Sequence, residues 1–237
     1  MDRKRYLIVV AGGSGTRMGA SVPKQFLELD GKSILHRTVE RFAEAVPDIK
    51  VVTVLPAEHI DAWKTYCYEN GFYCPQTLVS GGITRFHSVK KGLEKVPDGA
   101  LVAVHDGVRP LVSAGLIGRL FGMAEECPAV IPVIPCVDTM KVLERRKDGD
   151  GDVRFEAVSG MKVDRNMLFG AQTPQVFRSE VLKDAYTQAF NTSFTDDASV
   201  AEAKNIPLTY VEGERYNIKI TSPDDLMLAR AILSLDL

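Results

Sequence analysis

Short apolar runs rich in β-branched residues alternate along this chain with longer stretches of helical period, and this alternation restricts the possible folds more than any other feature. The strand-like runs are residues 6–10, 50–55, 101–104 and 129–134. The stretches with helical spacing are residues 34–45, 60–68, 88–96 and 116–126. Strands that alternate with helices in this way form parallel sheets with helices on their faces. The sequence therefore predicts an α/β fold with a mainly parallel sheet.

The composition fits one large globular domain. The chain has 237 residues, of which 45% are apolar, and 29 Lys and Arg against 31 Asp and Glu give a formal net charge of −2. This balance argues against a generally cationic nucleic-acid-binding protein, and the apolar fraction is too high for a disordered chain. Because no linker or internal repeat separates a second unit, residues 1–237 are expected to form a single domain.

No segment of the sequence predicts a membrane span or a secretion signal. The uninterrupted apolar runs, such as residues 7–11, are far shorter than the ~20 residues of a membrane helix. The N-terminal apolar stretch ends at Gly12 and has no cleavage site of small residues. The four cysteines and four histidines lack the spacing of a disulfide framework or a zinc site. We expect a cytoplasmic protein that binds neither a membrane nor nucleic acid.

A charged segment interrupts the alternation in the second half of the chain. Between Lys141 and Val163 the periodicity lapses, and Asp-Gly repeats lie between short β-prone flanks. These features favour either a β-hairpin arm that leaves the main body or a disordered surface loop, and the segment alone leaves both open. Beyond it, the pattern predicts helices at residues 179–190 and 198–203 and a strand at residues 208–211. A last helix is predicted to begin after Ser222, which can cap it, with Pro223 in its first turn.

A glycine-rich loop follows the first predicted strand, at the position where α/β proteins bind nucleotides. It runs Ala11-Gly12-Gly13-Ser14-Gly15-Thr16-Arg17-Met18-Gly19. Met18 stands where a dinucleotide fingerprint needs glycine or alanine, and the Gly-Lys-Ser/Thr of a P-loop is absent. A glycine loop alone is more typical of an ordinary tight turn than of a nucleotide site. Two nearby cations, Arg17 and Lys24, favour the binding of a polyphosphate whose leaving oxygen gains negative charge.

These residues resemble the signature of nucleotidyltransferases of the 2-C-methyl-D-erythritol 4-phosphate cytidylyltransferase family. The resemblance extends in order through Pro23-Lys24-Gln25, Ser80-Gly81-Gly82, Ser88-Val89, His105-Asp106-Gly107-Val108-Arg109-Pro110, residues 135–141, Val163-Asp164-Arg165-Asn166, Gln172-Thr173-Pro174-Gln175, Thr195-Asp196-Asp197-Ala198-Ser199 and Asn217-Ile218-Lys219-Ile220-Thr221. Several separated motifs in one order are specific, whereas a single glycine loop is not. The resemblance implies a single Rossmann-like nucleotidyltransferase domain.

The resemblance also implies an enzyme that transfers CMP from CTP to 2-C-methyl-D-erythritol 4-phosphate in isoprenoid precursor synthesis, with Mg2+ as cofactor. By resemblance, the catalytic residues are Arg17, Lys24, Arg165 and Lys219. The expected CTP-binding residues are Ala11, Gly12, Gly13, Gly15, Gly82, Arg85, Ser88 and Asp106. The resemblance also makes Asp106 the expected Mg2+ ligand. It stands at the end of a predicted strand, where a carboxylate can meet a metal but where a lone aspartate equally caps a turn.

The phosphorylated sugar alcohol is expected to bind a further set of residues. They are Arg109, Thr139, Arg165, Thr173 and Lys219. In the family, Arg165 and Thr173 are contributed across a dimer interface. The resemblance therefore implies a homodimer with shared active sites, in which residues 140–163 form a dimerisation arm.

Other functions remain open on the sequence. A ribitol 5-phosphate cytidylyltransferase shares the fold, the loop and the cation pair, although such enzymes tend to have a longer insert between Gly19 and Pro23 than this chain has. A non-catalytic nucleotide sensor would have no need of cations directed at reacting oxygens. An NAD-dependent dehydrogenase is disfavoured by Met18.

Overall fold

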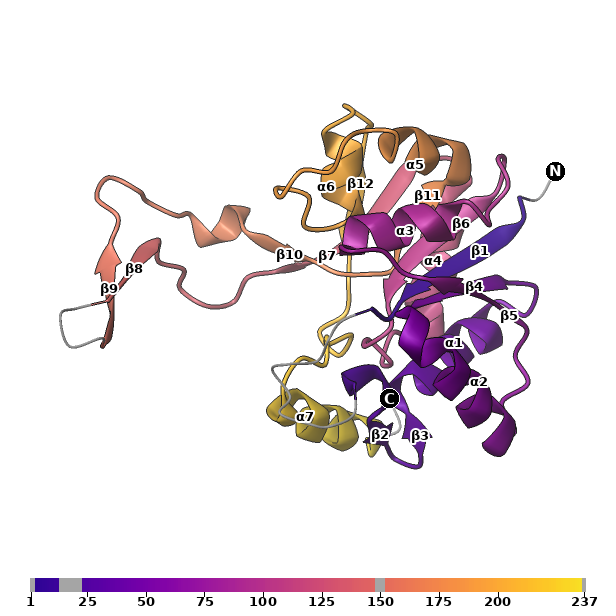
Figure 1. Cartoon of the computed structure of the whole chain (residues 1–237). Helices are drawn as coiled ribbons and strands as arrows, with labels where there is room; N and C mark the ends of the chain where they lie inside the picture. Colours follow the sequence, from indigo (N-terminus) through magenta and orange to yellow (C-terminus); the bar gives the residue numbers. More distant parts are fainter. Residues whose placement is uncertain (1–2, 13–22, 148–151, 236–237) are drawn as a thin grey trace.

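The computed structural model describes residues 3–12, 23–147 and 152–235. Within these ranges eight strands form one sheet, whose hydrogen-bonded order is β5-β4-β1-β6-β11-β7-β10, with β12 also paired to β7 (Figure 1). The strands are β1 (Arg5–Val10), β4 (Lys50–Leu55), β5 (Gln76–Ser80), β6 (Leu101–Asp106), β7 (Ala129–Pro135), β10 (Phe169–Ala171), β11 (Gln175–Arg178) and β12 (Thr209–Glu212). β1 pairs in parallel with β4 and β6, β4 with β5, and β7 with β12. The predicted mainly parallel sheet is confirmed.

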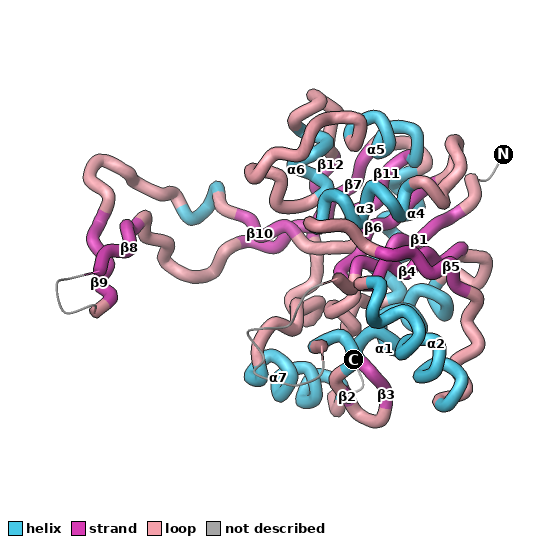
Figure 2. The backbone as a smooth tube through the Cα atoms, viewed as in Figure 1, coloured by secondary structure: helices cyan, strands magenta, loops and turns pink. Residues whose placement is uncertain are grey.

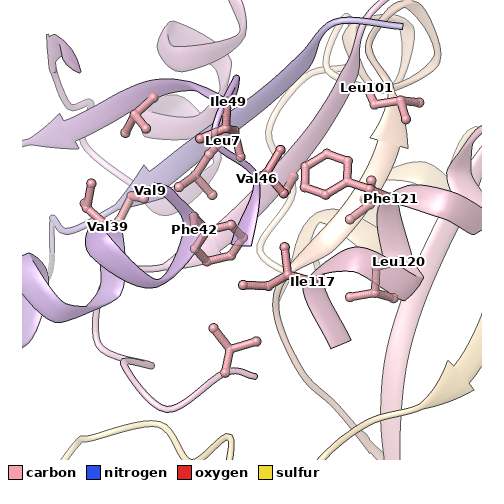
Figure 3. Close-up of a cluster of buried hydrophobic side chains, with 14 of the residues drawn as sticks. Leu7, Val9, Val39, Phe42, Val46, Ile49, Leu101, Ile117, Leu120 and Phe121 are labelled. Carbon is pink, nitrogen blue, oxygen red and sulfur yellow. The ribbon is translucent and has the colours of Figure 1, made fainter. Parts of the chain in front are cut away.

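Helices cover both faces of this sheet. One face packs against α1 (Ile34–Ala45), α2 (Ile60–Glu69) and α4 (Ala114–Ala124), and the other against α3 (Arg85–Leu93), α5 (Ser179–Ala185) and α6 (Asp197–Glu202). Neighbouring residues of β1 supply both cores, because Leu7 and Val9 face the first set of helices and Ile8 faces the second. Figure 3 shows the first core, where Phe42 of α1 and Phe121 of α4 lie against the sheet.

The C-terminal helix, α7 (Pro223–Leu233), lies outside these two layers. It packs in a small third cluster with Leu29 and Ile220, beside the short hairpin of β2 (Glu28–Leu29) and β3 (Lys32–Ser33). Its predicted cap is confirmed, because Ser222 Oγ accepts a hydrogen bond from the Asp225 backbone N–H at 3.2 Å. This helix therefore anchors the segment that carries Lys219.

Some element boundaries differ from those predicted. α3 begins at Arg85 rather than at residue 88, because Thr84 is its N-cap and its hydroxyl accepts a hydrogen bond from the His87 N–H. α5 ends at Ala185 rather than at residue 190, and the Thr187 hydroxyl there donates to the carbonyl of Asp184. β5, β10 and β11 are absent from the predicted elements, and β11 runs antiparallel between β6 and β7.

The charged segment forms an arm that projects from the main body (Figures 1 and 2). β8 (Leu143–Lys147) and β9 (Val153–Ala157) pair antiparallel, which confirms the hairpin rather than the surface loop. All residues of both strands are exposed. The chain returns through a short 3-10 helix, Arg165–Met167, to β10 at the edge of the sheet.

None of the helices in the described part of the chain is long and apolar enough to cross a membrane. The four cysteines are free thiols. The strands β5, β4, β1 and β6 run parallel to one another, so the segments that leave their carboxyl ends meet at one edge of the sheet. Ligands of open α/β sheets bind at this edge.

Candidate active site

A pocket of about 230 Å³ opens beyond the carboxyl ends of β1 and β6. Eight of the residues predicted for CTP binding or catalysis line it: Ala11, Gly12, Lys24, Gly82, Arg85, Ser88, Asp106 and Lys219. They come from five separate segments of the chain, which the sheet topology gathers at one edge. Three further predicted residues, Gly13, Gly15 and Arg17, lie outside the described residues. The pocket thus contains most of the predicted nucleotide site.

The start of the glycine loop is fixed to the sheet. The Ala11 N–H donates to the Val54 carbonyl of β4 at 2.9 Å. The buried side chain of Gln25 donates from Nε2 to the Ala11 carbonyl, also at 2.9 Å. Gln25 belongs to a 3-10 helix, Lys24–Phe26, so the same turn that holds the loop presents Lys24 to the pocket. Gln25 therefore has a positioning role that the sequence analysis did not assign.

Gly82 and Ser88 form the opposite wall. The Gly82 N–H donates to Ser88 Oγ at 3.0 Å, and that hydroxyl donates to the Thr84 carbonyl at 3.0 Å. A Cβ added to Gly82 would lie 2.4 Å from the Cβ of His87, so a larger residue would displace the loop. Glycine at this position lets the backbone approach the first turn of α3 closely. The buried Ser88 side chain holds that approach in place.

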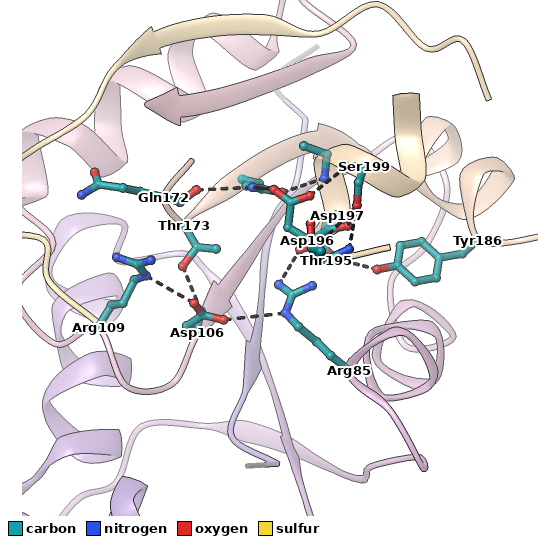
Figure 4. A network of polar contacts seen from close by, with 12 residues as sticks. Arg85, Asp106, Arg109, Gln172, Thr173, Tyr186, Thr195, Asp196, Asp197 and Ser199 are labelled. Carbon is teal, nitrogen blue, oxygen red and sulfur yellow. Dashed lines mark hydrogen bonds and ion pairs between the residues drawn. The ribbon is translucent and has the colours of Figure 1, made fainter. Parts of the chain in front are cut away.

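Asp106, the last residue of β6, lies between the side chains of Arg85 and Arg109 (Figure 4). Its Oδ2 lies 2.9 Å from Lys219 Nζ and 3.3 Å from Arg109 Nε, and its Oδ1 lies 3.7 Å from Arg85 Nε. Burial alone would raise the pKa of the Asp106 carboxyl. The three cations and the Lys219 hydrogen bond outweigh it and hold that pKa well below its usual range. The pocket therefore contains a permanent carboxylate surrounded by positive charge.

Arg85 joins Asp106 to a second carboxylate that the sequence analysis gave no role. Arg85 Nη2 lies 2.6 Å from Oδ2 of Asp197, which is fully buried. Asp197 Oδ1 accepts a hydrogen bond from the Tyr186 hydroxyl at 2.6 Å. Burial opposes the charge on Arg85, but the two carboxylates raise its pKa above the ordinary value. Asp196 and Asp197 together look in sequence like helix-capping acids, and only Asp196 caps α6.

Two of the predicted acceptor residues, besides Lys219, lie beside Asp106. The Asp106 N–H donates to Thr173 Oγ1 at 3.0 Å, and Thr173 is buried. Arg109 donates from Nη1 to the Asn217 carbonyl at 2.8 Å, which ties it to the segment of Lys219. The resemblance assigned Thr173 to the neighbouring subunit. In this structure Thr173 is already in place beside the Asp106 of its own chain.

The His105 side chain contacts the turn that carries Arg109. Its Nε2 lies 3.0 Å from the Arg109 carbonyl, and its ring packs on Phe42. Burial lowers the pKa of His105 to about 4, so the ring is neutral at physiological pH. Among the described residues its Nδ1 has no hydrogen-bond partner. His105 therefore helps to hold the turn that carries Arg109.

The two other predicted acceptor residues lie outside the pocket, on the base of the arm. Thr139 and Arg165 are both exposed. Arg165 Nη1 donates to the Val137 carbonyl at 3.2 Å, which places it beside the segment of Thr139. Neither residue lines the pocket of its own chain. The structure of a single chain thus divides the predicted acceptor site into two groups.

The donor set suits a divalent metal that arrives with a phosphorylated ligand. No group of three or more His, Cys, Asp or Glu side chains gathers for a metal within the described ranges. Asp106 offers one carboxylate, and Oδ1 is its more open oxygen, because within the described ranges the one ion pair of Oδ1 is the 3.7 Å contact with Arg85. Mg2+ is commonly held by one or two carboxylates together with substrate phosphates and water. The pocket fits that pattern.

Comparison with known proteins identifies relatives along nearly the whole chain. The family model described as "IspD: 2-C-methyl-D-erythritol 4-phosphate cytidylyltransferase" matches residues 6–235. A curated protein of that name from Bacteroides fragilis is 47% identical over 230 residues, covering 97% of this chain and 99% of the relative. One from Porphyromonas gingivalis is 46% identical over 236 residues, covering 99% and 100%.

Solved structures of similar proteins share the fold. The crystal structure of 4-diphosphocytidyl-2C-methyl-D-erythritol synthase from Anaerococcus prevotii superposes with a TM-score of 0.77 at 27% identity, covering 99% of this chain and 100% of the other. The 2-C-methyl-D-erythritol 4-phosphate cytidylyltransferase from Thermus thermophilus gives a TM-score of 0.70 at 30% identity, covering 99% and 100%.

Proposed function

Because the chain belongs to the 2-C-methyl-D-erythritol 4-phosphate cytidylyltransferase family, we propose that it transfers CMP from CTP to 2-C-methyl-D-erythritol 4-phosphate. The products are 4-diphosphocytidyl-2-C-methylerythritol and pyrophosphate, and the reaction serves isoprenoid precursor synthesis. The observation that carries the proposal is the pocket beyond β1 and β6, in which Ala11 and Gly12 at the start of the glycine loop, Lys24 and the Asp106 cluster come together.

In the proposed reaction a phosphate oxygen of the acceptor attacks the α-phosphorus of CTP. The new P–O bond forms as the bond between the α-phosphorus and the bridging oxygen breaks, and the electron pair leaves with pyrophosphate. Lys24 and Arg17 stabilise the charge that grows on the transferring and departing phosphates. Gly82 and Ser88, which are hydrogen-bonded to each other, form the wall of the pocket against which the cytosine is proposed to lie. The chain supplies position and charge and forms no covalent intermediate.

We assign the Mg2+ site to Asp106, with the remaining ligands supplied by the phosphates of CTP and by water. Mg2+ there would neutralise phosphate charge and favour one triphosphate conformation. Arg85, Lys219 and Arg109 lower the pKa of the Asp106 carboxyl, so it is ionised at neutral pH. Asp106 thus links the nucleotide side of the pocket to the acceptor side.

The acceptor phosphate is proposed to bind between Lys219, Arg109 and Thr173 of one chain and Arg165 of a second chain. Thr139 belongs to the same contribution from the second chain. The exposed arm and the exposed position of Arg165, away from its own pocket, support a homodimer with shared sites. Arms that reach across two-fold partners place a residue of each subunit in the other's pocket.

The deciding experiment measures pyrophosphate release from CTP and Mg2+ with 2-C-methyl-D-erythritol 4-phosphate and, in parallel, with ribitol 5-phosphate. Release with the first acceptor alone is expected. Release with ribitol 5-phosphate alone would identify the chain as a ribitol 5-phosphate cytidylyltransferase, which serves polymer precursor synthesis. A folded protein that binds CTP and releases pyrophosphate with neither would instead be a nucleotide-binding module.

A further inference from the structure

Arg85 lies between two carboxylates that hold it unequally. Its Nη2 is 2.6 Å from Asp197 Oδ2, whereas its Nε is 3.7 Å from Asp106 Oδ1. The first distance is that of a short charge-assisted hydrogen bond, and the second is too long for any hydrogen bond. The side chain is only about a quarter exposed, at 27%. Arg85 is therefore anchored on Asp197 and only approaches Asp106.

Asp197 is itself fixed. It is fully buried in α6, and both of its oxygens have a partner: Arg85 on Oδ2 and the Tyr186 hydroxyl on Oδ1. Burial and the adjacent carboxylate raise the pKa of Tyr186 well above its ordinary value, so the phenol keeps the proton that it donates. The Tyr186 ring also stacks on Phe86, the residue after Arg85, with ring centroids 4.6 Å apart. Tyr186 thus holds both the carboxylate and the start of α3.

The two oxygens of Asp106 differ as a result. Among the described residues, Oδ2 has Lys219 at 2.9 Å and Arg109 at 3.3 Å, whereas the one ion pair of Oδ1 is the longer contact with Arg85. A guanidinium with no other carboxylate would close on Oδ1, because a paired charge is strongly favoured in a partly buried site. That closure would occupy the oxygen best placed for a cation arriving with a triphosphate.

We propose that Asp197, held by Tyr186, is a positioning residue that anchors Arg85 on the pocket wall and keeps Oδ1 of Asp106 open for the cation that accompanies CTP. The inference rests on the proposed function, since it concerns the CTP site. Neither Asp197 nor Tyr186 lines the pocket. Each acts through the placement of Arg85.

Removing the charge of Asp197 tests the proposal, because a purely electrostatic effect and the loss of Arg85 positioning change the affinity for Mg2+-CTP in opposite directions. Removing a negative charge near a polyanion site would by Coulomb's law alone strengthen CTP binding, with or without Mg2+. If Asp197 positions Arg85, Asp197→Asn instead weakens binding of CTP in saturating Mg2+ by about tenfold, as loss of an outer partner of a metal ligand does. Binding of CTP without Mg2+ should stay equal or become tighter.

The experiment is calorimetric titration of the full chain with CTP, with and without Mg2+, after the melting temperature of each variant is recorded. Tyr186→Phe keeps the ring stack and removes only the hydrogen bond to Asp197, so a Mg2+-dependent loss of about threefold is expected. The matched control is Asp184→Asn on α5, which removes a carboxylate whose partner is the surface residue Lys204. That variant should bind CTP like the wild type.

A double-mutant cycle shows whether Asp197 acts through Arg85. In an Arg85→Ala background, Asp197→Asn should cause no further loss of Mg2+-CTP affinity, whereas a full additional loss would overturn the inference. Equal weakening with and without Mg2+, or no change in a folded Asp197→Asn variant, would also overturn it. If Asp197→Asn does not fold, Tyr186→Phe decides. A wild type that binds no CTP would instead remove the proposed function, and this inference with it.

Discussion

At the scale of single residues, the Asp106 carboxylate offsets the repulsion between the cationic side chains that gather at this pocket. Lys219, Arg109 and Arg85 come from different segments, and each would repel the others if no carboxylate lay between them. Asp106 and Asp197 together offset two of these three charges. The remaining positive charge, with that of Lys24, faces the pocket and suits a polyphosphate.

Lys24→Ala is expected to reduce turnover far more than CTP affinity. The contact of Lys24 should strengthen as charge develops on the departing phosphates, so its loss removes transition-state stabilisation rather than ground-state binding. Steady-state kinetics and CTP titration measure the two quantities separately. Lys64→Ala, which removes an exposed lysine on α2 paired with Asp61, is the matched control and should change neither. An equal loss in both quantities for Lys24→Ala would contradict this role.

The sequence predicts those site residues that stand next to a recognisable strand or motif. The glycine loop follows a strand, and Asp106 ends one, so both are placed by pattern alone before any family is considered. Asp197 and Tyr186 carry no such signal. Arg85 and Asp197 are 112 positions apart, and only the packing of α3 against α5 and α6 brings them together. Gln25 was part of a recognised motif but was given no role, because nothing in the sequence shows that a glutamine next to a lysine is buried.

At the scale of elements, the helices use glycine in two ways. Gly92 of α3 packs on β1 and β4, where an added Cβ would lie 2.9 Å from Ile8 Cγ2 and 3.2 Å from Val54 Cγ2. Gly118 of α4 is exposed, with no heavy atom within 4 Å of a Cβ built there. The first glycine is required by close packing, whereas the second only weakens its helix.

These two glycines give a matched pair of variants. Gly118→Ala is expected to raise the free energy of unfolding by about 0.5–1 kcal/mol, because alanine restricts the unfolded chain and favours the helix. Gly92→Ala should lower it by about 1–3 kcal/mol, since the methyl group overpacks the core. Urea denaturation of both variants measures the difference. Equal effects of the same sign would show that helix propensity, not packing, governs both positions.

α1 carries a buried histidine that makes stability depend on pH. Burial lowers the pKa of His36 below its ordinary value of 6.5, although Glu40 opposes the shift. The unfolded chain therefore binds the proton more readily, and the free energy of unfolding falls as the pH drops below 6.5. The difference between wild type and His36→Gln, measured by urea denaturation from pH 7 to pH 5, should decrease steadily. A difference independent of pH would show that His36 does not titrate on unfolding.

The alternation of strands and helices was enough to predict the sheet and both helical layers, because long periodic segments report burial directly. β10 and β11 were missed for a physical reason. They are short, and β11 enters the sheet antiparallel between β6 and β7 after the chain has returned from the arm. Such a strand is defined by its neighbours on both sides and not by its own four residues. The turn that leads into this missed strand brings the Thr173 hydroxyl to the backbone N–H of Asp106.

At the scale of the whole molecule, the arm separates Arg165 and Thr139 from the pocket they are proposed to serve. If sites are shared, Arg165→Ala should raise the KM for the acceptor, and mixing it with inactive Lys24→Ala dimers should restore activity. Random exchange of equal amounts leaves about a quarter of all sites with both residues intact. Activity after mixing, with exchange verified by mass spectrometry, measures this. No recovery would mean that each chain builds its site alone.

β6 lies at the centre of the sheet, between β1 and β11, and all six of its residues are buried. Amide protons in such a strand exchange with solvent only when the whole domain opens, an event far rarer than a catalytic cycle. Asp106 is carried on this strand. Its backbone therefore stays in place through very many rounds of substrate arrival and product departure, and adjustments between those states fall to the side chains and loops around it.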